Sequence, residues 1–495
     1  MKNRLRILML SSEVTPFAKT GGLADVAGAL PKKLHDKGHD IRVIMPRYGG
    51  ISERKFVLRD VIRLKKIPIK MCGKEYTVSA KSAFLPDSKV QVYLLEHKPF
   101  FGRKDLYVDP QTGKAFSDNP ERFMLFCRAV IEMMRILHWK PQVIHCNDWQ
   151  TALLPWFLKH QNLDDGFFDD TSTLLSIHNM AYQGDFSTDA LTKSGCMNDL
   201  SPDDDLIKYD KINFLRAGLV TADAISTVSP TYAGEILDNQ ESAAGLQEEL
   251  LQRKNDLYGI LNGVDYNVWD PKTDPLIDAN YDVDSLDQKS ENKKALLKEA
   301  KLPYDENTIL VGIISRLAEQ KGFDIISEAI DDMLKMNLQI VVLGTGDPMY
   351  HKFWQDMMKK YPQKIAAFLT FDETLAHKIE ASSDVFLMPS RFEPSGLNQL
   401  YSLRYGTVPV VRKTGGLADT ITDFVQNPET GNGFVFTDYD SKSMLSALQN
   451  AVKTYSDRKT WVTLQLRGMQ ADYSWKAAAE NYLQLYQDMI EKKNS

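Results

Sequence analysis

The sequence is poor in cysteine, and its cysteines have no metal-binding or redox spacing. The 495 residues include four cysteines and no Cys-x-x-Cys pair, which excludes zinc-ribbon and thioredoxin-like motifs. So few cysteines in so long a chain are typical of a reducing compartment. We therefore expect free, mostly buried thiols at Cys72, Cys127, Cys146 and Cys196.

Long apolar runs are also missing. No uncharged run approaches the roughly 18–20 residues that a membrane helix needs. Near the N-terminus, Arg6 is followed by an apolar patch of four residues that ends at Ser11, which is too short for a signal-peptide core. This patch predicts a first β-strand. We expect a cytoplasmic protein with no membrane partner.

Neither charge sign dominates. Lys and Arg number 60 against 66 Asp and Glu, so the formal net charge is -6, and this balance gives no electrostatic footprint for nucleic acid. Gly and Pro are near average, and 43% of residues are hydrophobic, which excludes disordered and collagen-like chains. The length predicts two large domains or three ordinary ones.

Short apolar runs alternate with segments of helical period along nearly the whole chain. Such alternation predicts an α/β fold with open, doubly wound parallel sheets. The expected strands are 5–11, 41–46, 92–96, 143–147, 174–178, 224–229, 310–315, 340–344, 368–371, 385–389 and 408–412. The expected helices are 23–36, 121–138, 209–220, 322–335, 374–382, 396–405, 443–455 and 475–492.

A segment rich in Gly, Asn, Asp and Pro divides the chain into two similar halves. It spans 257–274 and reads LYGILNGVDYNVWDPKTD. We expect an N-terminal domain at 1–256, a second domain at 257–474, and a C-terminal helical segment at 475–495. Gly259 and Gly263 would let this link act as a hinge.

One string, KTGGLAD, occurs twice, at 19–25 and at 413–419. Each copy follows an apolar strand and opens a helical stretch, which predicts two similar lobes; coincidence is the weaker interpretation. Two glycines let the backbone approach a ligand closely, and a following helix points its N–H groups at it. With Lys19 as a point charge, the first copy resembles a phosphate cradle.

Two clusters follow strands in the second half. Arg316 and Lys321 lie five residues apart and can converge on one pyrophosphate, although a solvated loop would look the same. Glu393 precedes the helix opened by Gly396 and Leu397. It either caps that helix or binds sugar hydroxyls, with helix N–H groups facing a nucleotide.

In the first half, HCNDW at 145–149 and His178 each end a strand. In open α/β sheets, ligands bind outside the carboxyl ends of strands, which brings Asp148 and His178 into consideration. We interpret His145 as a packed histidine. The acidic runs at 169–170 and 203–205 are better explained as solvated loops than as metal ligands.

The longer motifs resemble bacterial glycogen synthases and plant starch synthases, from residue 5 to about 490. The matching segments are KTGGLADV, HCNDW, IHNMAYQG, TVSPTYAGEI, ILNGVD, SRLAEQKGFD, SRFEPSGLNQLYSLRYGTVPVVRKTGGLADT and NGFVF. The resemblance implies two Rossmann-like domains that face each other across a cleft, the GT-B arrangement. It also implies an ADP-glucose donor, an α-1,4-glucan acceptor, and no metal or other cofactor.

The resemblance also implies roles for individual residues. Lys19, Gly22, Arg316 and Lys321 would bind the diphosphate; Glu393 would hold the glucosyl hydroxyls, and His178 would lie beside the anomeric carbon. The remaining implied substrate-binding residues are Asp148, Asn262, Leu397 and Asn398. Three residues depart from the family pattern: Ser395 replaces a frequent Cys, Asn398 a frequent Thr, and Gln150 a frequent His.

The resemblance implies transfer of a glucosyl group from ADP-glucose to the non-reducing 4-hydroxyl of an α-1,4-glucan, with retention. With no sure carboxylate nucleophile, we favour a front-face path, and a double displacement stays open. The alternatives are a glucan phosphorylase, which needs a lysine-bound pyridoxal phosphate, and a catalytically silent glucan-binding protein. Because neither half holds all these residues, we expect closure of an open protein when ADP and an acceptor sugar bind. The sequence does not specify the oligomeric state.

Overall fold

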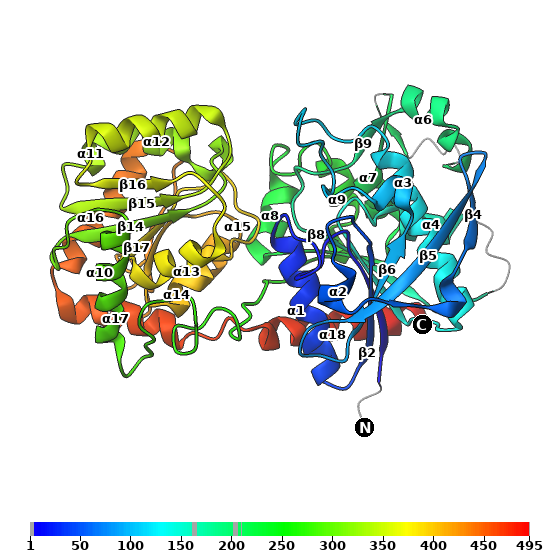
Figure 1. Cartoon of the computed structure of the whole chain (residues 1–495), viewed down its shortest axis with the longest axis horizontal. Coiled ribbons are helices and arrows are strands. Elements are labelled where there is room, and N and C mark those ends of the chain that lie inside the picture. The colour runs from blue at the N-terminus through cyan, green and yellow to red at the C-terminus, as the bar shows by residue number, and fades with distance from the viewer. Residues whose placement is uncertain (1–3, 161–165, 201–205, 209, 495) are drawn as a thin grey trace. The chain divides into compact units, whose positions relative to one another are not determined.

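Two α/β units make up the chain, and each is built on its own largely parallel sheet (Figure 1). The computed structural model describes residues 4–160, 166–200, 206–208 and 210–494. Unit 1 comprises Met1–Val228, Ala233–Ile260 and Trp475–Ser495, and unit 2 comprises Ser229–Tyr232 and Leu261–Ser474. The α/β fold class expected from the sequence is confirmed. No described helix is long and apolar enough to cross a bilayer.

The sheet of unit 2 is entirely parallel. Taken in chain order its strands lie 3-2-1-4-5-6, the order of the doubly wound Rossmann fold. Across the sheet they are β16 (Ile365–Phe368), β15 (Leu338–Leu343), β14 (Ile309–Ile314), β17 (Val385–Met388), β18 (Val408–Arg412) and β19 (Phe434–Phe436).

Helices cover both faces of this sheet, because successive strand residues point to opposite sides. In β14, Val311 packs into the larger core with Trp354 and Trp461, while Leu310 packs into a second core on the other face. The helices of unit 2 are α10 (Lys289–Glu299), α11 (Phe323–Met333), α12 (Pro348–Lys360), α13 (Glu373–Ser382), α14 (Asn398–Arg404), α15 (Gly415–Thr420), α16 (Ser441–Tyr455) and α17 (Arg458–Gln470).

The sheet of unit 1 has the same order among its parallel strands, extended by a seventh, and then adds an antiparallel edge. Its parallel strands, across the sheet, are β13 (Leu257–Gly259), β12 (Ala224–Thr227), β8 (Ser172–Ile177), β7 (Val143–Asn147), β1 (Arg6–Leu10), β2 (Asp40–Pro46) and β6 (Gln91–Glu96). Strand β5 (Lys74–Phe84) runs antiparallel to β6, β4 (Ile67–Met71) and β3 (Arg59–Asp60).

A small antiparallel sheet and several helices complete unit 1. The small sheet joins β10 (Ile207–Lys208), β11 (Lys211–Asn213) and β9 (Asp185–Ser187). The helices are α1 (Gly22–Asp36), α2 (Glu53–Phe56), α3 (Lys98–Phe101), α4 (Asn119–Leu137), α5 (Leu153–His160), α6 (Thr188–Ser194), α7 (Phe214–Thr221), α9 (Gln247–Gln252) and α18 (Trp475–Asn494). Helix α8 (Pro230–Asp238) begins in the segment Ser229–Tyr232 assigned to unit 2 and continues into unit 1.

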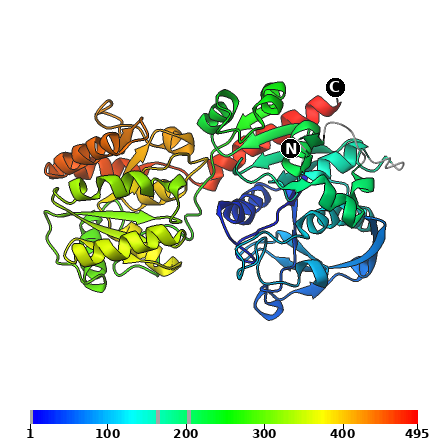
Figure 2. The ribbon, with the colours of Figure 1, turned by 90° about the horizontal axis from the view of Figure 1, so that it is seen from above.

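The C-terminal helix α18 packs against α1 and β8 of unit 1 and is drawn in red in Figure 2. Its buried face carries Trp475, Ala479, Tyr482 and Tyr486, which are spaced at three or four residues as on one side of a helix. The tyrosine hydroxyl of Tyr486 bonds His145 Nδ1 at 2.8 Å. The last segment of the chain is therefore part of the core of the first unit.

Two expected elements differ from the observed ones by three residues or more at one or both ends, and the other expected elements agree within two residues. The strand expected at 368–371 is β16, which ends at Phe368; Ile365 is buried, whereas Phe371 is 81% exposed. The helix expected at 209–220 begins only at Phe214, because Asn213 ends β11 and its side chain caps α7 by accepting from the Arg216 N–H. Tyr209 lies outside the described residues.

The expectation of four free thiols is wrong for two of the cysteines. Cys72 and Cys196 form a disulfide, although 124 residues separate them in the sequence. The turn between β4 and β5 places Cys72 beside the segment that follows α6, a contact that sequence spacing does not reveal. Cys127 and Cys146 are free and buried, as expected.

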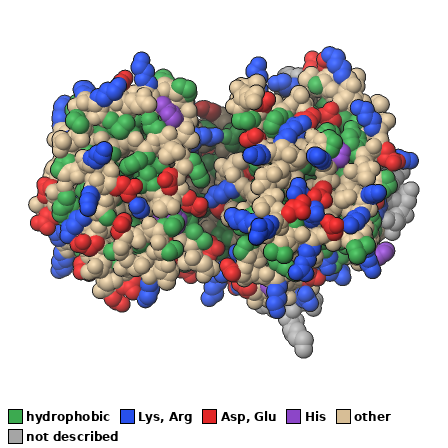
Figure 3. Space-filling view, viewed as in Figure 1, with side chains coloured by type: hydrophobic (Ala, Val, Ile, Leu, Met, Phe, Trp, Pro, Cys, Tyr) green, Lys and Arg blue, Asp and Glu red, His purple; other side chains and the backbone are tan. Residues whose placement is uncertain are grey.

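The face shown in Figure 3 carries Lys and Arg side chains interspersed with Asp and Glu on both units. Among the described residues, many charged side chains form exposed ion pairs, such as Lys335 with Asp332 at 2.6 Å and Lys360 with Asp331 at 2.9 Å. Exposed pairs of this kind contribute about 0–1 kcal/mol each, so the fold rests mainly on its buried cores.

Candidate functional site

The strand order of unit 2 reverses between β14 and β17, which are neighbours in its sheet. A doubly wound sheet opens a crevice at the carboxyl ends of the two strands where its order reverses. Arg316 lies two residues beyond β14, and Glu393 lies five residues beyond β17. Both predicted residues therefore come from the loops that border this crevice.

A cavity of about 150 Å³ lies at this place in unit 2. It brings together five of the six site residues that the sequence predicts in this half of the chain, and it adds the hydroxyl of Ser390. The predicted residues that line it are Arg316, Lys321, Glu393, Leu397 and Asn398.

Glu393 is the buried carboxylate of this cavity, with only 6% of its surface exposed. The Lys321 ammonium donates to Glu393 Oε2 at 2.5 Å, and the Ser390 hydroxyl donates to the same oxygen at 3.1 Å. Among the described residues, both side-chain donors to this carboxylate thus bond one oxygen. The arrangement places a cation and a carboxylate side by side, suited to a ligand with both an anionic group and hydroxyls.

The two predicted asparagines support the cavity in different ways. Asn398 opens α14 and donates from Nδ2 to the carbonyl of Ile314 at 2.8 Å, which ties α14 to the end of β14. Asn262 does not line the cavity. Its Nδ2 donates at 3.1 Å to the hydroxyl of Ser395, which lies two residues after Glu393 in the sequence.

The second KTGGLAD copy supports the same turn. The N–H of Gly416 donates to the carbonyl of Glu393 at 3.2 Å. A Cβ added to Gly415 would lie 2.1 Å from that carbonyl oxygen, and Gly415 has φ +42, in the left-handed region. Only glycine allows this close approach, so the second copy holds the Glu393 turn in place.

In unit 1 the strand order reverses between β1 and β7, and Asp148 follows β7 directly. Asp148 Oδ1 accepts from the N–H of His178 at 2.7 Å, so the structure brings these two predicted residues together. Burial raises the pKa of Asp148 to about 7; the negative charge of Glu13 adds to this, and the His178 N–H opposes it. The carboxyl group is therefore poised to change charge near neutral pH.

The ring of His178 is oriented by Asn147. Asn147 Nδ2 donates to the carbonyl of Leu10 at 2.8 Å, so its Oδ1 faces His178 Nε2 at 2.9 Å and accepts a hydrogen bond from the Nε2–H group. Burial lowers the pKa of His178 to about 4, so the ring is neutral at pH 7, with Nδ1 as its unprotonated nitrogen. The fully buried His145 bonds Tyr486 and Ser176, which confirms that it is a packed histidine.

The first KTGGLAD copy forms the end of the loop before α1 and the first turn of that helix, which begins at Gly22. Lys19 is partly exposed, and its ammonium pairs with Asp25 Oδ1 at 2.7 Å. The buried carboxylate of Glu13 accepts from both the N–H and the hydroxyl of Thr20, the latter at 2.6 Å. The lysine therefore stands on an anchored loop at the positive end of a 15-residue helix.

Glu13 and Ser390 are the two polar residues of these sites that sequence reasoning missed. Glu13 follows the first strand in SSEV, and Ser390 opens the SRFEPSGL motif, so both lie at carboxyl ends of strands. Position at the carboxyl end of a strand, where ligands bind in open α/β sheets, was the sequence signal that could have identified them. Their partners, Thr20 and Glu393, are set by tertiary contacts.

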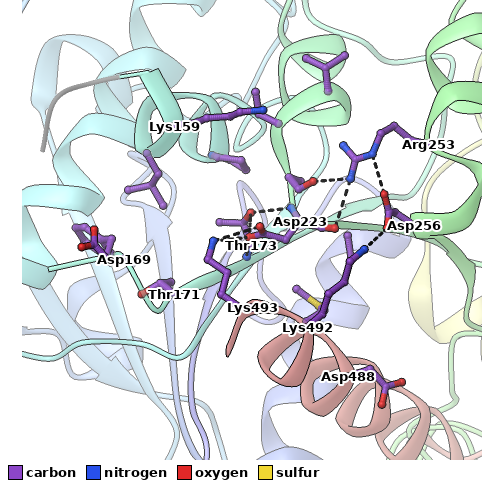
Figure 4. Close-up of a pocket in the computed structure, with 18 of the residues that line it drawn as sticks. Lys159, Asp169, Thr171, Thr173, Asp223, Arg253, Asp256, Asp488, Lys492 and Lys493 are labelled. Atoms are coloured by element: carbon purple, nitrogen blue, oxygen red, sulfur yellow. Dashed lines mark hydrogen bonds and ion pairs between the residues drawn. The ribbon is translucent and has the colours of Figure 1, made fainter. Parts of the chain in front are cut away.

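A larger cavity, of about 890 Å³, lies elsewhere in unit 1 (Figure 4). It is lined by Thr171 and Thr173 near the start of β8, and by Asp223 just before β12, so it opens at the amino ends of the strands. Its charges are largely paired, as in Lys493 with Asp223 at 3.2 Å and Lys492 with Asp256 at 2.8 Å. It contains none of the predicted site residues.

The acidic runs give no metal site among the described residues, where no group of three or more His, Cys, Asp or Glu is arranged to hold an ion. Asp170 is exposed and pairs with Lys140 at 2.8 Å, which fits a solvated loop. The run at 203–205 lies outside the described residues.

The comparisons with known proteins show a glycosyltransferase, and its fold has two Rossmann-like units. The model of the family described as starch synthase catalytic domain matches residues 6–252, and the one described as glycosyl transferases group 1 matches 296–463. The glycogen synthase of Desulforudis audaxviator is 44% identical over 99% of this chain and 97% of its own length. That of Geotalea daltonii is 44% identical over 99% of this chain and 100% of its own length.

Solved structures agree with these sequence matches. The catalytic domain of starch synthase IV from Arabidopsis thaliana, bound to ADP and acarbose, superposes with a TM-score of 0.89 and 32% identity, covering 99% of this chain and all of that one. Sucrose-phosphate synthase from Thermosynechococcus elongatus, at TM-score 0.59 and 17% identity, shares the fold. The chain belongs to the glycogen and starch synthase family, as its motifs predicted.

Proposed function

We propose that this glycogen synthase family member transfers glucose from ADP-glucose to the non-reducing 4-hydroxyl of an α-1,4-glucan, with retention, and releases ADP. One observation carries the donor assignment. Arg316, Lys321 and Glu393 line one small cavity at the strand-order reversal of unit 2. The solved starch synthase that is 32% identical to this chain binds ADP, which supports the choice of nucleotide.

The difficult step is departure of ADP, because negative charge gathers on the pyrophosphate while positive charge gathers on the sugar. We propose that Arg316 and Lys321 stabilise the departing phosphate, since preorganised cations act where charge develops. Lys19, on its anchored loop in unit 1, would add a third cation. Glu393 would hold the glucosyl hydroxyls through the oxygen that Lys321 and Ser390 leave available.

Retention follows from a front-face path. The bond between the anomeric carbon and the phosphate oxygen breaks, the acceptor 4-oxygen bonds that carbon from the same face, and the acceptor proton passes to the departing phosphate oxygen. A double displacement would instead require a carboxylate nucleophile on the opposite face. The sequence pattern offers no clear candidate for that carboxylate.

We propose that two residues of unit 1, His178 and Asp148, act on the sugar and not on the diphosphate. We propose that His178 lies beside the anomeric carbon in its neutral form, since burial lowers its pKa to about 4. A neutral ring adds no positive charge next to a sugar that is itself becoming positive. Asp148, which accepts from the His178 backbone, would bind sugar hydroxyls.

An assay of ADP release in the presence of glycogen tests the proposal. We expect ADP release together with incorporation of glucose into glycogen, and a higher kcat/KM for ADP-glucose than for UDP-glucose. Equal or reversed values for the two donors would refute the donor assignment. A protein that binds glycogen and releases no ADP would be the catalytically silent alternative.

A further inference from the structure

The hydroxyl of Ser390 is buried at the carboxyl end of β17, where it contacts Glu393. Ser390 is 2% exposed and lies two residues beyond the last residue of the strand. Its Oγ donates to Glu393 Oε2 at 3.1 Å. A buried hydroxyl that donates its hydrogen bond to a carboxylate fixes the orientation of that carboxylate.

Orientation matters here because the two oxygens of Glu393 have different surroundings. Lys321 and Ser390 both bond Oε2, so Oε1 is the oxygen left for a ligand. The terminal torsion of a glutamate is broad and roughly two-fold, so the torsion alone does not decide which oxygen faces the cavity. The two donors on Oε2 do decide it.

The two donors differ in a way that separates their roles. Lys321 has a long side chain, 22% exposed, and it lines the cavity where the diphosphate is proposed to bind. When a phosphate binds the Lys321 ammonium, this new contact competes with the hydrogen bond from Lys321 to Glu393. Ser390 is short, buried and at the end of a strand, so its bond persists.

We propose that Ser390 is a positioning residue that keeps Glu393 Oε1 turned toward the glucosyl group while Lys321 engages the diphosphate. The inference rests on the proposed function, in which Glu393 binds the sugar and Lys321 binds the phosphate. It assigns Ser390 to recognition of the sugar and not of the nucleotide. The two ends of the donor can therefore be tested separately, with ADP and with ADP-glucose.

The test compares the affinities of Ser390→Ala for ADP and for ADP-glucose by titration calorimetry. ADP affinity should stay within about two-fold of wild type, which also shows that the variant is folded. ADP-glucose affinity should fall roughly 10- to 100-fold, the loss that follows removal of a hydrogen bond to a charged group. With glycogen present, kcat/KM for ADP-glucose should fall by a similar factor.

Ser382 supplies the matched control. It is 1% exposed at the end of α13 in the same unit, and its hydroxyl has no partner among the described residues. Ser382→Ala makes the same change to a buried serine away from Glu393, so it should bind both ligands like wild type. In a Glu393→Ala background, adding Ser390→Ala should change ADP-glucose affinity no further, because Ser390 acts through that carboxylate.

The outcomes separate the inference from the proposed function. If wild type binds ADP-glucose and Ser390→Ala binds it equally well, or loses ADP and ADP-glucose in parallel, Ser390 does not position the sugar contact and the inference is wrong. An additive loss in the Glu393→Ala background overturns it as well. If the wild-type protein itself binds ADP but gains nothing from the glucosyl group, the proposed function fails and the role of Ser390 falls with it.

Discussion

Lys321 serves two anions in the proposed reaction, the Glu393 carboxylate and the departing diphosphate. Arg316→Ala or Lys321→Ala should therefore lower kcat roughly 10²- to 10³-fold, as loss of one preorganised stabilising group often does. The measurement is steady-state release of ADP, with thermal unfolding as the check on folding. Lys335→Ala, which removes an exposed lysine paired with Asp332 in the same unit, should leave kcat unchanged. If kcat were normal in both site variants, Arg316 and Lys321 would have no catalytic role and would be ordinary surface cations.

Asp148 and His178 make opposite contributions to the pH dependence of stability. The pKa of Asp148 is about 7 in the folded protein, above its ordinary value, so the folded state binds more protons and this group's contribution falls as pH rises from about 4 to 7. The pKa of His178 is about 4, below its ordinary value, so its contribution rises over about pH 4 to 6.5. In wild type the two effects partly cancel.

Asp148→Asn removes one of these two contributions. The urea midpoint of the variant should rise between pH 4.5 and 6.5 more steeply than that of wild type, since the variant lacks the Asp148 contribution, which falls with pH over this range, and keeps the contributions of the other groups. Asp170→Asn is the control, because that carboxyl is exposed and its pKa is held below the ordinary value by Lys140. Parallel pH profiles for wild type and Asp148→Asn would contradict the buried, proton-binding state of Asp148.

At the scale of elements, identical strings occupy different backbone settings. In the first KTGGLAD copy, Gly21 has φ -157, and a Cβ there would meet nothing within 4 Å. In the second copy, the equivalent Gly415 has φ +42 and a carbonyl 2.1 Å from the position of a Cβ. The repeat therefore shares its strand-to-helix context but not its backbone conformation.

Gly415→Ala should destabilise unit 2 by about 1–3 kcal/mol and lower activity, because it combines strain at a left-handed position with displacement of the Glu393 turn. Gly21→Ala should cost about 0.5–1 kcal/mol, because it replaces a favourable N-cap residue but introduces neither a left-handed conformation nor a close contact. Chemical unfolding of the two variants side by side measures this. Equal losses of unfolding free energy in the two variants would mean that the Glu393 turn moves to accommodate the added Cβ of Gly415→Ala.

The sequence predicted the central parallel strands best. Strands β7 and β18 match their expected ranges residue for residue; β7 is buried throughout, and β18 is buried up to its last residue. Strand β5 was missed, since its buried and exposed residues alternate irregularly along an antiparallel edge. The bounds of α7 were missed because the capping of Asn213 depends on a small sheet formed by distant segments.

The candidate site shows the same division. Motifs identified Lys321 and Glu393. In the structure, Lys321 Nζ lies 2.5 Å from Glu393 Oε2, although 72 positions separate the two residues in the sequence. Ser390 stood inside a recognised motif without a role, because the oxygen that it bonds is defined only by the folded turn. The Cys72–Cys196 pairing had no signal in sequence spacing either.

For the molecule as a whole, the site chemistry predicts independence from divalent cations. Lysine and arginine supply the positive charge that a metal ion would otherwise place on a diphosphate, so glucosyl transfer should survive exhaustive EDTA treatment. A magnesium-dependent kinase assayed in the same buffer shows that chelation is complete. Activity that disappears with EDTA and returns with Mg²⁺ or Mn²⁺ would contradict the prediction.

The position of α18 has a consequence for how the protein is made. A ribosome synthesises β7, β8 and β12 well before α18, the helix whose Tyr486 bonds His145. Until α18 has been synthesised, the first unit must expose the buried groups that Tyr482 and Tyr486 later cover. The first unit is thus begun before unit 2 and completed after it, and nascent chains that stall before Trp475 are natural clients for chaperones.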